Sequence, residues 1–381
     1  MSIKRKILFV TGSRGEYGYI RPLLRLIQND KDIEFEILVT NMHLLSEFGN
    51  SLEEFNKDGL PVHYKVYNTL DGYNTVTMPK SLGIFLIQIP EILERSKPSI
   101  VLISGDRGEQ LMAAVAAAHM NIPVAHIQAG EVSGNIDGNI RHAITKIAHI
   151  HFASNQDAYD RVKRLGEEEF RIFNTGAPLV DELVDPEFTD SEIFLKYTIN
   201  QNKPIFLVVQ HPVTEEYDFA DKQMEETLKA VNEFDAEVIL ILPNSDAGNK
   251  ELNKIINKYK TPNYHIFRNL PRADYASFMK YCNIMIGNSS SGIMEAPSFK
   301  IPVVNIGRRQ IGRQQDENVI NVLHDARQIA LAIKQALSPK FKEKFKNCKN
   351  LYGDGKSSQR ILDILKNIKI DEKLINKKIT Y

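Results

Sequence analysis

The stretch KILFVTGSRGEYGYIRPLLRLIQ, Lys6 to Gln28, decides the fold of this chain. Its first part, KILFVT, is a short run rich in Ile, Leu and Val, which is typical of a strand buried on both faces of a parallel sheet. A glycine-rich turn follows, and YIRPLLRLIQ then places apolar residues at spacings of three and four, as an amphipathic helix does. A buried strand, a glycine turn and a helix in this order predict one unit of a doubly wound α/β fold.

The same unit recurs along the chain. Short apolar runs predict strands at 6–12, 35–40, 99–106, 123–130, 150–155, 171–176, 205–211, 237–244, 264–269, 284–290 and 301–307. The alternation pauses over 178–203, and 381 residues exceed what one core usually takes. We therefore predict two Rossmann-like doubly wound domains, 1–180 and 204–357, facing each other across a cleft. The C-terminal helix and tail, 358–381, are expected to cross back to the first domain.

Composition and charge exclude several classes of protein. The 48 basic and 48 acidic residues give no net charge, which argues against a broad surface for nucleic acid or an anionic membrane. Two distant cysteines, Cys282 and Cys348, indicate a reduced, cytoplasmic setting. No apolar run approaches the ~18 residues of a membrane span, and the basic start is too short in apolar residues for a signal peptide. The Lys-rich tail is predicted to be a solvated surface.

Polar and glycine residues follow most of the predicted strands, where ligands bind in open α/β sheets. The segment GNSSSGIMEA, Gly287 to Ala296, follows a strand and opens a helix. Three hydroxyls and several backbone N–H groups at a helix start suit a phosphate, and Glu295 is placed to accept hydrogen bonds from ribose. The alternative is an ordinary N-cap with a spare serine.

Other strand ends carry charged or polar side chains with two interpretations each. Arg14 and Arg309 follow strands and would bind a diphosphate, or are solvated loop residues. Asp106 is a candidate general base, or the N-cap of the next helix. His211 is a functional histidine, or a core residue satisfied by backbone; Asn244 binds a base or sugar, or starts a turn.

The stretch GEVSGNIDGNIRHAITKIAH, Gly130 to His149, joins a glycine-rich acidic loop to a helix. Glu131 and Asp137 lie in its first half, and Arg141 lies on the helix. No metal-ligand spacing such as H-E-x-x-H is present, so we expect no metal. The segment is typical of one that closes on a substrate and brings a carboxylate to it.

Together, five motifs resemble the hydrolysing nucleotide-sugar 2-epimerases: GEVSGNIDGNIRHAITKIAH, QHPVT, PNSDAG, GNSSSG and RQIGRQQDENV. The most similar members are bacterial UDP-N-acetylglucosamine 2-epimerases that begin sialic acid synthesis, and the epimerase half of the bifunctional animal enzyme. The resemblance runs from SRGEYG to YGDGKSSQRIL, most of the chain. Non-hydrolysing relatives carry a GTRPE-like turn where this chain has GSRGE, and lack the GEVSG insertion.

This resemblance implies a GT-B-like fold, no soluble cofactor, and a homodimer or dimer of dimers. It implies conversion of UDP-N-acetylglucosamine and water to N-acetylmannosamine and UDP through a glycal intermediate. By resemblance, Asp106 and Asp137 are acid/base residues and His211 stabilises the departing diphosphate. The nucleotide and its diphosphate are assigned to Arg14, Arg107, His211, Asn244, Ser289, Ser290, Glu295 and Arg309. The substrate-binding set also includes Gly18, Gln128, Arg141 and Gly292.

Gln128 departs from the family pattern, since this chain has HIQAGE where the N-acetylglucosamine enzymes have HIEGGE. A neutral amide cannot transfer a proton, so either Glu131 substitutes as the acid/base group or the substrate differs. The alternative substrate is a UDP- or GDP-linked 2,4-diacetamido-2,4,6-trideoxyglucose of legionaminic acid synthesis, because an amide can donate to an added N-acetyl group. A GT-B glycosyltransferase and a nucleotide-sugar sensor without catalysis are the remaining alternatives.

Overall fold

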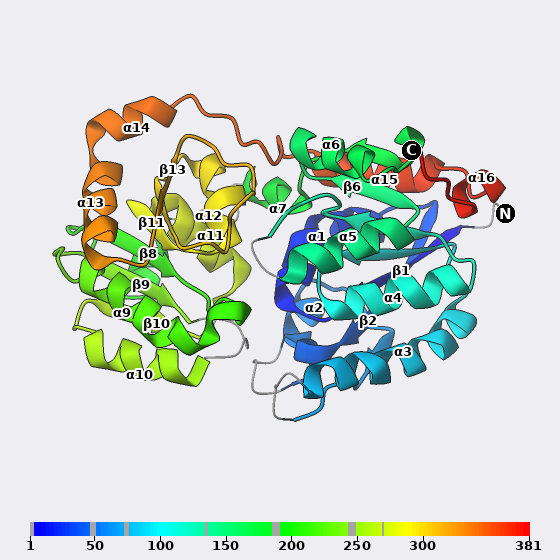
Figure 1. The fold of residues 1–381 in the computed structure, drawn as a ribbon, viewed down its shortest axis with the longest axis horizontal. Coiled ribbons are helices and arrows are strands. Elements are labelled where there is room, and N and C mark those ends of the chain that lie inside the picture. The colour runs from blue at the N-terminus through cyan, green and yellow to red at the C-terminus, as the bar shows by residue number, and fades with distance from the viewer. Residues whose placement is uncertain are drawn as a thin grey trace. The chain divides into compact units, whose positions relative to one another are not determined.

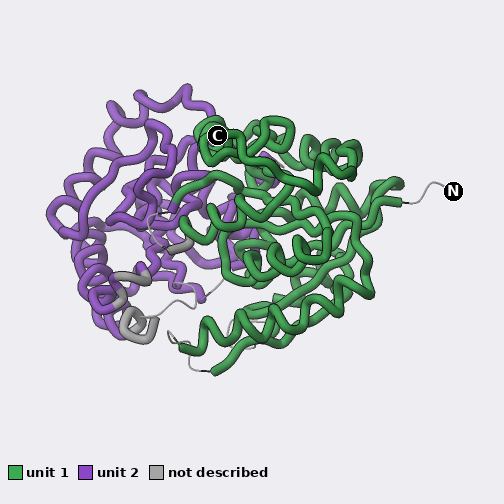
Figure 2. Tube along the Cα trace, turned by 45° about the vertical axis from the view of Figure 1, so that its right-hand side comes forward, with its two compact units in different colours: residues 1–132, 136–181, 352–381 green, residues 133–135, 182–351 purple. Residues whose placement is uncertain are grey.

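The computed structural model describes residues 4–45, 51–71, 76–133, 136–184, 191–242, 249–268 and 270–381, without the side chains of 136, 137, 214, 215, 217 and 249–253. The chain divides into two compact units (Figure 2). The first comprises residues 1–132, 136–181 and 352–381, and the second comprises 133–135 and 182–351. The sequence predicted domains at 1–180 and 204–357. In the structure, residues 182–203, which precede the predicted second domain, belong to the second unit, and residues 352–357 belong to the first.

The first unit contains a sheet of seven parallel strands in the order β3-β2-β1-β4-β5-β6-β7 (Figure 1). The strands are β1 (Arg5–Thr11), β2 (Ile33–Thr40), β3 (Tyr64–Val66), β4 (Ile100–Ser104), β5 (Val124–Ile127), β6 (Ile150–Ala153) and β7 (Ile172–Asn174). Phe9 of β1 pairs with Ile37 on one side and Leu102 on the other. Both neighbours are apolar because a central parallel strand is covered on both faces.

Helices cover this sheet. They are α1 (Arg14–Gln28), η1 (Asn41–Leu44), α2 (Leu52–Lys57), α3 (Thr77–Ser96), α4 (Gly108–His119), α5 (Ile136–Ile147), α6 (Gln156–Arg164), η3 (Glu169–Arg171), α7 (Pro178–Asp181), α15 (Ser357–Asn367) and α16 (Glu372–Ile375). Leu8 and Val10 pack with Phe85 of α3 and Ile144 of α5 in one core. Helix α15 packs against α1, and its first two N–H groups bond to the carboxylate of Asp181 at 3.0 and 2.6 Å.

The second unit has six parallel strands in the order β10-β9-β8-β11-β12-β13. They are β8 (Ile205–Val209), β9 (Glu237–Ile241), β10 (Tyr264–Phe267), β11 (Ile284–Gly287), β12 (Val303–Ile306) and β13 (Val319–Val322). Around them lie η4 (Glu182–Val184), α8 (Ile193–Lys196), η6 (Thr214–Phe219), α9 (Ala220–Val231), α10 (Asn249–Tyr259), α11 (Arg272–Tyr281), α12 (Ser290–Met294), η7 (Ala296–Phe299), α13 (Ala326–Leu337) and α14 (Pro339–Phe345). Phe206 and Val208 face one core, and Leu207 and Val209 face another, as strand alternation requires.

Both units share the strand order of the Rossmann fold, 3-2-1-4-5-6 in their own numbering, so the predicted pair of doubly wound domains is confirmed. The order reverses between β1 and β4 in the first unit and between β8 and β11 in the second. Ligands of such sheets bind beyond the carboxyl ends of the strands at this reversal. No described helix is long and apolar enough to cross a membrane.

Candidate active site

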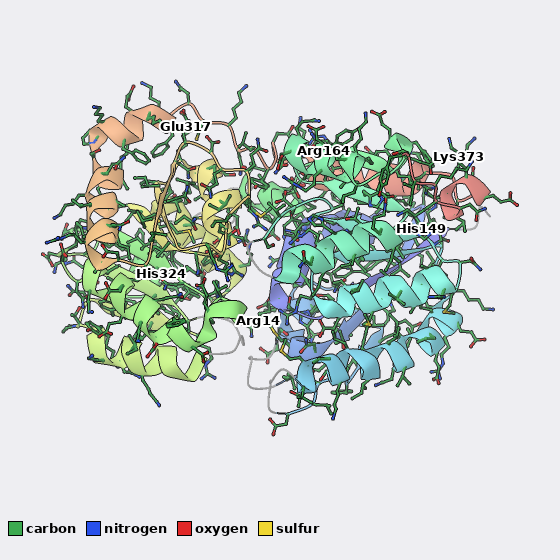
Figure 3. The ribbon with its side chains drawn as sticks, viewed as in Figure 1. Arg14, His149, Arg164, Glu317, His324 and Lys373 are labelled. Atoms are coloured by element: carbon green, nitrogen blue, oxygen red, sulfur yellow. The ribbon has the colours of Figure 1, made fainter. Side chains whose placement is uncertain are left out.

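The turn after β1 presents Arg14 as the first residue of α1 (Figure 3). Ser13 is the N-cap of this helix, and Glu16 completes a capping box. The Glu16 carboxyl group accepts hydrogen bonds from the backbone N–H groups of Gly12, at 2.6 Å, and Ser13, at 3.1 Å. Burial raises the pKa of Glu16 to about 8, an effect that the Arg107 guanidinium opposes. The side chains of Ser13 and Glu16 therefore fix the conformation of the turn in which they lie.

Asp106 follows β4 and is held by Arg141 of α5. The Arg141 guanidinium forms an ion pair with Asp106 and donates to the backbone carbonyl of Gln128 at 3.1 Å. The Arg141 side chain is 2% exposed, so it positions these two residues from inside the protein. The alternative that Asp106 is a helix N-cap is wrong, because α4 begins at Gly108 and Arg107 occupies the N-cap position.

Buried contacts fix the turn that carries Asp106. The His126 Nε2 atom lies 2.7 Å from the carbonyl oxygen of Gly105, and the ring is fully buried. Burial lowers the pKa of His126 to about 3, so the ring is neutral and donates one hydrogen bond to this carbonyl. Arg107 lies beside the turn, with its Nε atom 3.8 Å from the Glu109 carboxylate.

Gln128 follows β5 with a φ of 68°, in the left-handed region. Residues other than glycine adopt this region rarely, and they concentrate at functional sites when they do. The buried hydroxyl of Tyr19 is hydrogen-bonded to the Gln128 side chain and lies 3.1 Å from the Ser154 hydroxyl. We call Asp106, Arg141, Gln128, Tyr19 and Ser154 the Asp106 cluster.

Glu131 lies beside this cluster at the start of the glycine-rich stretch. Its carboxylate accepts a hydrogen bond from the Asn155 side chain at 3.1 Å, and Asn155 also accepts from the N–H of Ala158 at 2.8 Å, as the N-cap of α6. Gly130 has a φ of 76°, and a Cβ there would lie 2.2 Å from the Ala158 carbonyl oxygen, so a glycine is required. The side chain of Asp137, the other predicted acid/base residue, lies outside the described residues.

In the second unit, Asn288 connects His211 and Arg309, two of the predicted diphosphate residues. Its side chain accepts from the N–H of His211 at 2.7 Å and donates to the His211 carbonyl at 2.8 Å. Its own carbonyl accepts from Arg309 at 3.1 Å and Gln310 at 2.9 Å. Burial, with Arg309 adding to it, lowers the pKa of His211 to about 3. The His211 imidazole is therefore neutral, not a cation, and has one N–H available to donate.

Ser289 is the N-cap of α12, as the alternative of an ordinary N-cap predicted. Its hydroxyl oxygen lies 3.4 Å from the backbone nitrogen of Ser291 and 2.9 Å from the Ser291 hydroxyl. Helix α12 has five residues, so its dipole is small and the hydroxyls and Arg309 have to carry more of any anion binding. Gly292 packs against β12, where a Cβ would lie 3.0 Å from a Val303 methyl group.

Glu295 pairs with Arg272, at 2.6 Å between Oε2 and Nη1, and Arg272 also contacts Glu182 at 3.1 Å. Burial raises the pKa of Glu295, and Arg272 opposes this shift. The ion pair holds Glu295 in place near α12. Asn244, the predicted ligand of the base or sugar, lies outside the described residues.

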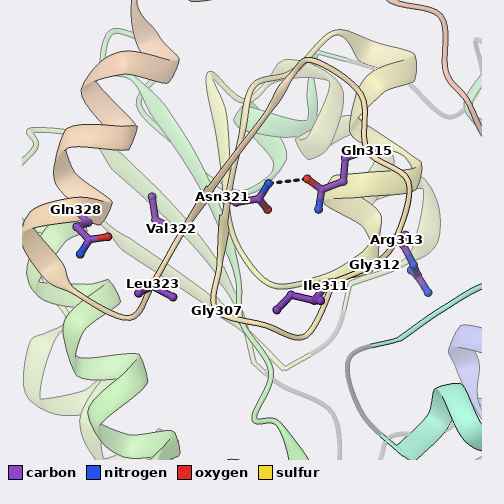
Figure 4. A pocket seen from close by; sticks show the side chains of 9 residues that line it. All are labelled: Gly307, Ile311, Gly312, Arg313, Gln315, Asn321, Val322, Leu323 and Gln328. Carbon is purple, nitrogen blue, oxygen red and sulfur yellow. Dashed lines mark hydrogen bonds between the residues drawn. The ribbon is translucent and has the colours of Figure 1, made fainter.

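A pocket of about 450 Å³ lies elsewhere in the second unit, between the loop after β12 and the start of α13 (Figure 4). It is lined by Gly307, Ile311, Gly312, Arg313, Gln315, Asn321, Val322, Leu323 and Gln328. None of these nine is among the predicted site residues, and the Asn321 side chain donates to the Gln315 side chain at 2.7 Å (Figure 4). Within the described residues, no group of three or more His, Cys, Asp or Glu side chains is arranged to hold a metal ion.

A family model described as UDP-N-acetylglucosamine 2-epimerase matches residues 25–366. The chain belongs to the UDP-N-acetylglucosamine 2-epimerase family. This 2-epimerase is 38% identical to the UDP-N,N'-diacetylbacillosamine 2-epimerase (hydrolyzing) of Legionella pneumophila, over 98% of both chains. It is 36% identical to the GDP/UDP-N,N'-diacetylbacillosamine 2-epimerase (hydrolyzing) of Campylobacter jejuni over 84% of both, and 30% identical to the UDP-N-acetylglucosamine 2-epimerase of Neisseria meningitidis over 88% of both.

Solved structures of this family share the fold of the 2-epimerase. The crystal structure of UDP-GlcNAc 2-epimerase from Neisseria meningitidis bound to UDP-GlcNAc matches with a TM-score of 0.81, covering 94% of this chain and 99% of that one at 20% identity. The Methanocaldococcus jannaschii enzyme in complex with UDP-GlcNAc and UDP matches with a TM-score of 0.78, covering 94% and 99% at 22% identity. The predicted class, a hydrolysing nucleotide-sugar 2-epimerase, is confirmed at the level of the family.

Four residues that contact members of the candidate site were not predicted: Tyr19, His126, Arg272 and Asn288. Each bonds to a residue or turn far away in the sequence; Tyr19 and Ser154, for example, are 135 positions apart. Asn288 alone left a signal, because it stands between a strand and a predicted phosphate loop.

Proposed function

We propose that this 2-epimerase hydrolyses a UDP-linked 2,4-diacetamido-2,4,6-trideoxyglucose and releases UDP and the free 2-epimer. The observation that carries the choice of sugar is Gln128, an amide in left-handed backbone beside the ion pair of Asp106 and Arg141. An amide side chain both donates and accepts, so it can pair with a second acetamido group, whereas a carboxylate only accepts. The names of two relatives, at 38% and 36% identity, support this choice.

The proposed reaction has two steps. Asp106 takes the proton from sugar carbon 2, and the bond between carbon 1 and the diphosphate oxygen breaks with its electron pair leaving on UDP. The product is a 2-acetamidoglycal. Water then adds its hydroxyl to carbon 1, and a proton is delivered to carbon 2 on the opposite face, giving the 2-epimer. Glu131 lies three residues after Gln128 and accepts from Asn155, the neighbour of Ser154, and we assign it, with Asp137, to this second proton transfer.

The diphosphate and uridine are assigned to residues of the second unit. Arg309 and the neutral imidazole of His211 donate to the diphosphate, with Ser289 and Ser290. Arg14 and Arg107 are assigned to the diphosphate by the family resemblance alone. Donors of this kind typically stabilise a leaving anion by ~2.7–4 kcal/mol each. Glu295, held by Arg272, accepts from ribose hydroxyls. Asn244 and Gly292 complete the proposed nucleotide set.

UDP-N-acetylglucosamine is the second candidate substrate, because the Neisseria meningitidis relative named for it is 30% identical. Incubation of the pure 2-epimerase with each UDP-sugar, followed by NMR of the products, distinguishes the two. We expect UDP and a free 2-epimer without any acceptor, with higher kcat/KM for the diacetamido sugar. UDP release that needs an acceptor would instead indicate a glycosyltransferase, and thermal stabilisation by UDP without turnover would indicate a sensor. A homodimer, also proposed, is tested by light scattering.

Gln128→Glu should reverse the substrate preference. The carboxylate loses the N–H donors for the second acetamido group, which corresponds to about 1–3 kcal/mol, or roughly ten- to a hundredfold in kcat/KM for the diacetamido sugar. Activity on UDP-N-acetylglucosamine should rise. Gln359→Glu, the same change at an exposed position of α15, is the control. An unchanged ratio of the two kcat/KM values would remove Gln128 from the choice of sugar.

Gly18→Ala should separate stability from substrate binding. Gly18 lies inside α1, and a Cβ there would meet nothing within 4 Å. Alanine in a helix interior should raise the free energy of unfolding by about 0.5–1 kcal/mol. Because Gly18 is assigned to the substrate-binding set, KM should rise several-fold at the same time. A more stable enzyme with an unchanged KM would take Gly18 out of the substrate-binding set.

A further inference from the structure

The segment that follows α15 is bound to the first unit. Asp371 caps α16 by accepting from the N–H of Leu374 at 3.0 Å. Arg171 is fully buried and donates to the carbonyl oxygens of Leu374 and Lys373, both at 2.6 Å. Thr380 donates its N–H to the carbonyl of Gly166 at 3.1 Å. Residues 371–380 therefore form a fixed part of this unit, with Lys373 labelled on α16 (Figure 3).

Lys377 of this segment caps the C-terminal end of α5. Its ammonium nitrogen lies 3.0, 2.9 and 2.6 Å from the carbonyl oxygens of Thr145, Lys146 and Ala148, and 2.8 Å from the Glu167 carboxylate. The last carbonyls of a helix have no partner inside the helix, and a cation there is favourable. The prediction that the Lys-rich tail is a solvated surface is therefore wrong for Lys377, whose side chain is 17% exposed.

The charge of Lys377 is matched by Glu167, whose side chain is 1% exposed. Glu167 also contacts Lys146 at 2.9 Å and His151 at 3.1 Å. Burial raises the pKa of Glu167, but the bonds from His151 and Lys377 outweigh it and bring the pKa to about 2. Glu167 is thus an anion that contacts both Lys377 of the tail and Lys146 near the end of α5.

A continuous series of bonds leads from Lys377 to the Asp106 cluster. Lys377 bonds to the carbonyl of Thr145, the Thr145 hydroxyl donates to the carbonyl of Arg141 at 3.1 Å, and Arg141 holds Asp106 and the Gln128 carbonyl. We propose that Lys377 is a positioning residue of the 2-epimerase: by capping α5 it fixes Arg141, and through Arg141 the orientation of Asp106. The catalytic part of this inference rests on the proposed function.

Lys377→Met tests the capping role without any substrate. Methionine keeps much of the side-chain length but cannot donate to the three carbonyls. We expect amide hydrogen exchange in the last turn of α5 to become at least about tenfold faster, because the helix end opens locally. Lys378→Met changes the exposed neighbour and should leave this exchange as in the wild type. If Lys377→Met does not fold, Lys377→Gln takes its place; it loses the positive charge and is one atom shorter, so exchange in the last turn of α5 should still become faster.

The kinetic test uses the same variants with the UDP-sugar that the wild type turns over. Lys377→Met should lower kcat about ten- to a hundredfold with KM changed less than twofold. The reason is that a small misplacement of a catalytic group slows the chemical step by a factor of this size. In one further variant, Lys377→Ala, ethylammonium should restore part of the kcat, whereas ethanol, which is of similar size but uncharged, should not.

The outcomes of the two tests separate the inference from the proposed function. Unchanged exchange in α5 together with an unchanged kcat would overturn the role of Lys377. Faster exchange with an unchanged kcat would leave a helix cap that does not act on Asp106, and would overturn the positioning role. A wild-type protein without turnover would instead contradict the proposed function, while the exchange experiment would still decide whether Lys377 caps α5.

Discussion

Asp106→Asn is expected to lower kcat of the 2-epimerase by about 10²–10⁴-fold, the range typical of a lost general base. Asparagine is nearly isosteric, and its side-chain oxygen can still accept from Arg141, so the turn after β4 should persist. It cannot take a proton from carbon 2 of the sugar. The affinity for UDP, measured by calorimetry, should stay within about twofold, because the nucleotide is assigned to other residues.

Two controls keep this result interpretable. Arg141 is 2% exposed, and an ion pair broken on one side can cost ~3–5 kcal/mol, so thermal unfolding has to show that the variant is folded at the assay temperature. Asp363→Asn makes the same change at an exposed position of α15 and should leave kcat unchanged. Full turnover by a folded Asp106→Asn variant would exclude Asp106 as the base.

Gly287→Ala is expected to have the largest effect on stability. Gly287 has a φ of 130°, and a Cβ there would lie 2.1 Å from the carbonyl oxygen and 2.6 Å from the carbonyl carbon of Val209. Both are backbone atoms of the paired strand β8, so β11 would have to move away from β8 at the point where the strand order reverses. Strained backbone costs about 1–3 kcal/mol and overpacking about 1–3 kcal/mol, so the free energy of unfolding should fall by about 2–6 kcal/mol.

The same substitution should weaken UDP binding, because His211 and Asn288 follow these two strands. Urea unfolding gives the stability, and calorimetry gives the affinity for UDP. Gly83→Ala in α3 is the matched control, since a Cβ there meets nothing within 4 Å, and it should stabilise by about 0.5–1 kcal/mol. A Gly287→Ala protein as stable as the wild type would show that β8 and β11 tolerate the displacement.

The sequence predicted the central strands of both sheets, because long runs such as KILFVT and IFLVVQ are apolar on both faces. It missed β3 and β13, which are edge strands of three and four residues with mixed burial, although it predicted β7 and β10 at the opposite edges. An edge strand needs no continuous apolar run, so the signal there depends on the composition of the individual segment. The strand order itself follows from pairing between distant segments and was predicted only as a fold class.

The candidate site was predicted in part for a similar reason. Residues at strand ends, such as Asp106 and His211, could be found because parallel strands place their carboxyl ends at one edge. Arg141 was in the predicted set, but its contact with Asp106, 35 positions away, was not predicted, and neither was the contact of Lys377 with Thr145 across 232 positions. Such contacts depend on how helices pack. Gln128 was singled out by sequence, but its left-handed backbone was not.

The most direct test of the central claim is turnover of the preferred UDP-sugar in deuterium oxide, followed by NMR of the free sugar. The account predicts a released 2-epimer that carries deuterium at carbon 2, with UDP formed in equal amount, because the proton leaves carbon 2 and a solvent proton replaces it. A released 2-epimer that retains its original hydrogen at carbon 2 would contradict the account.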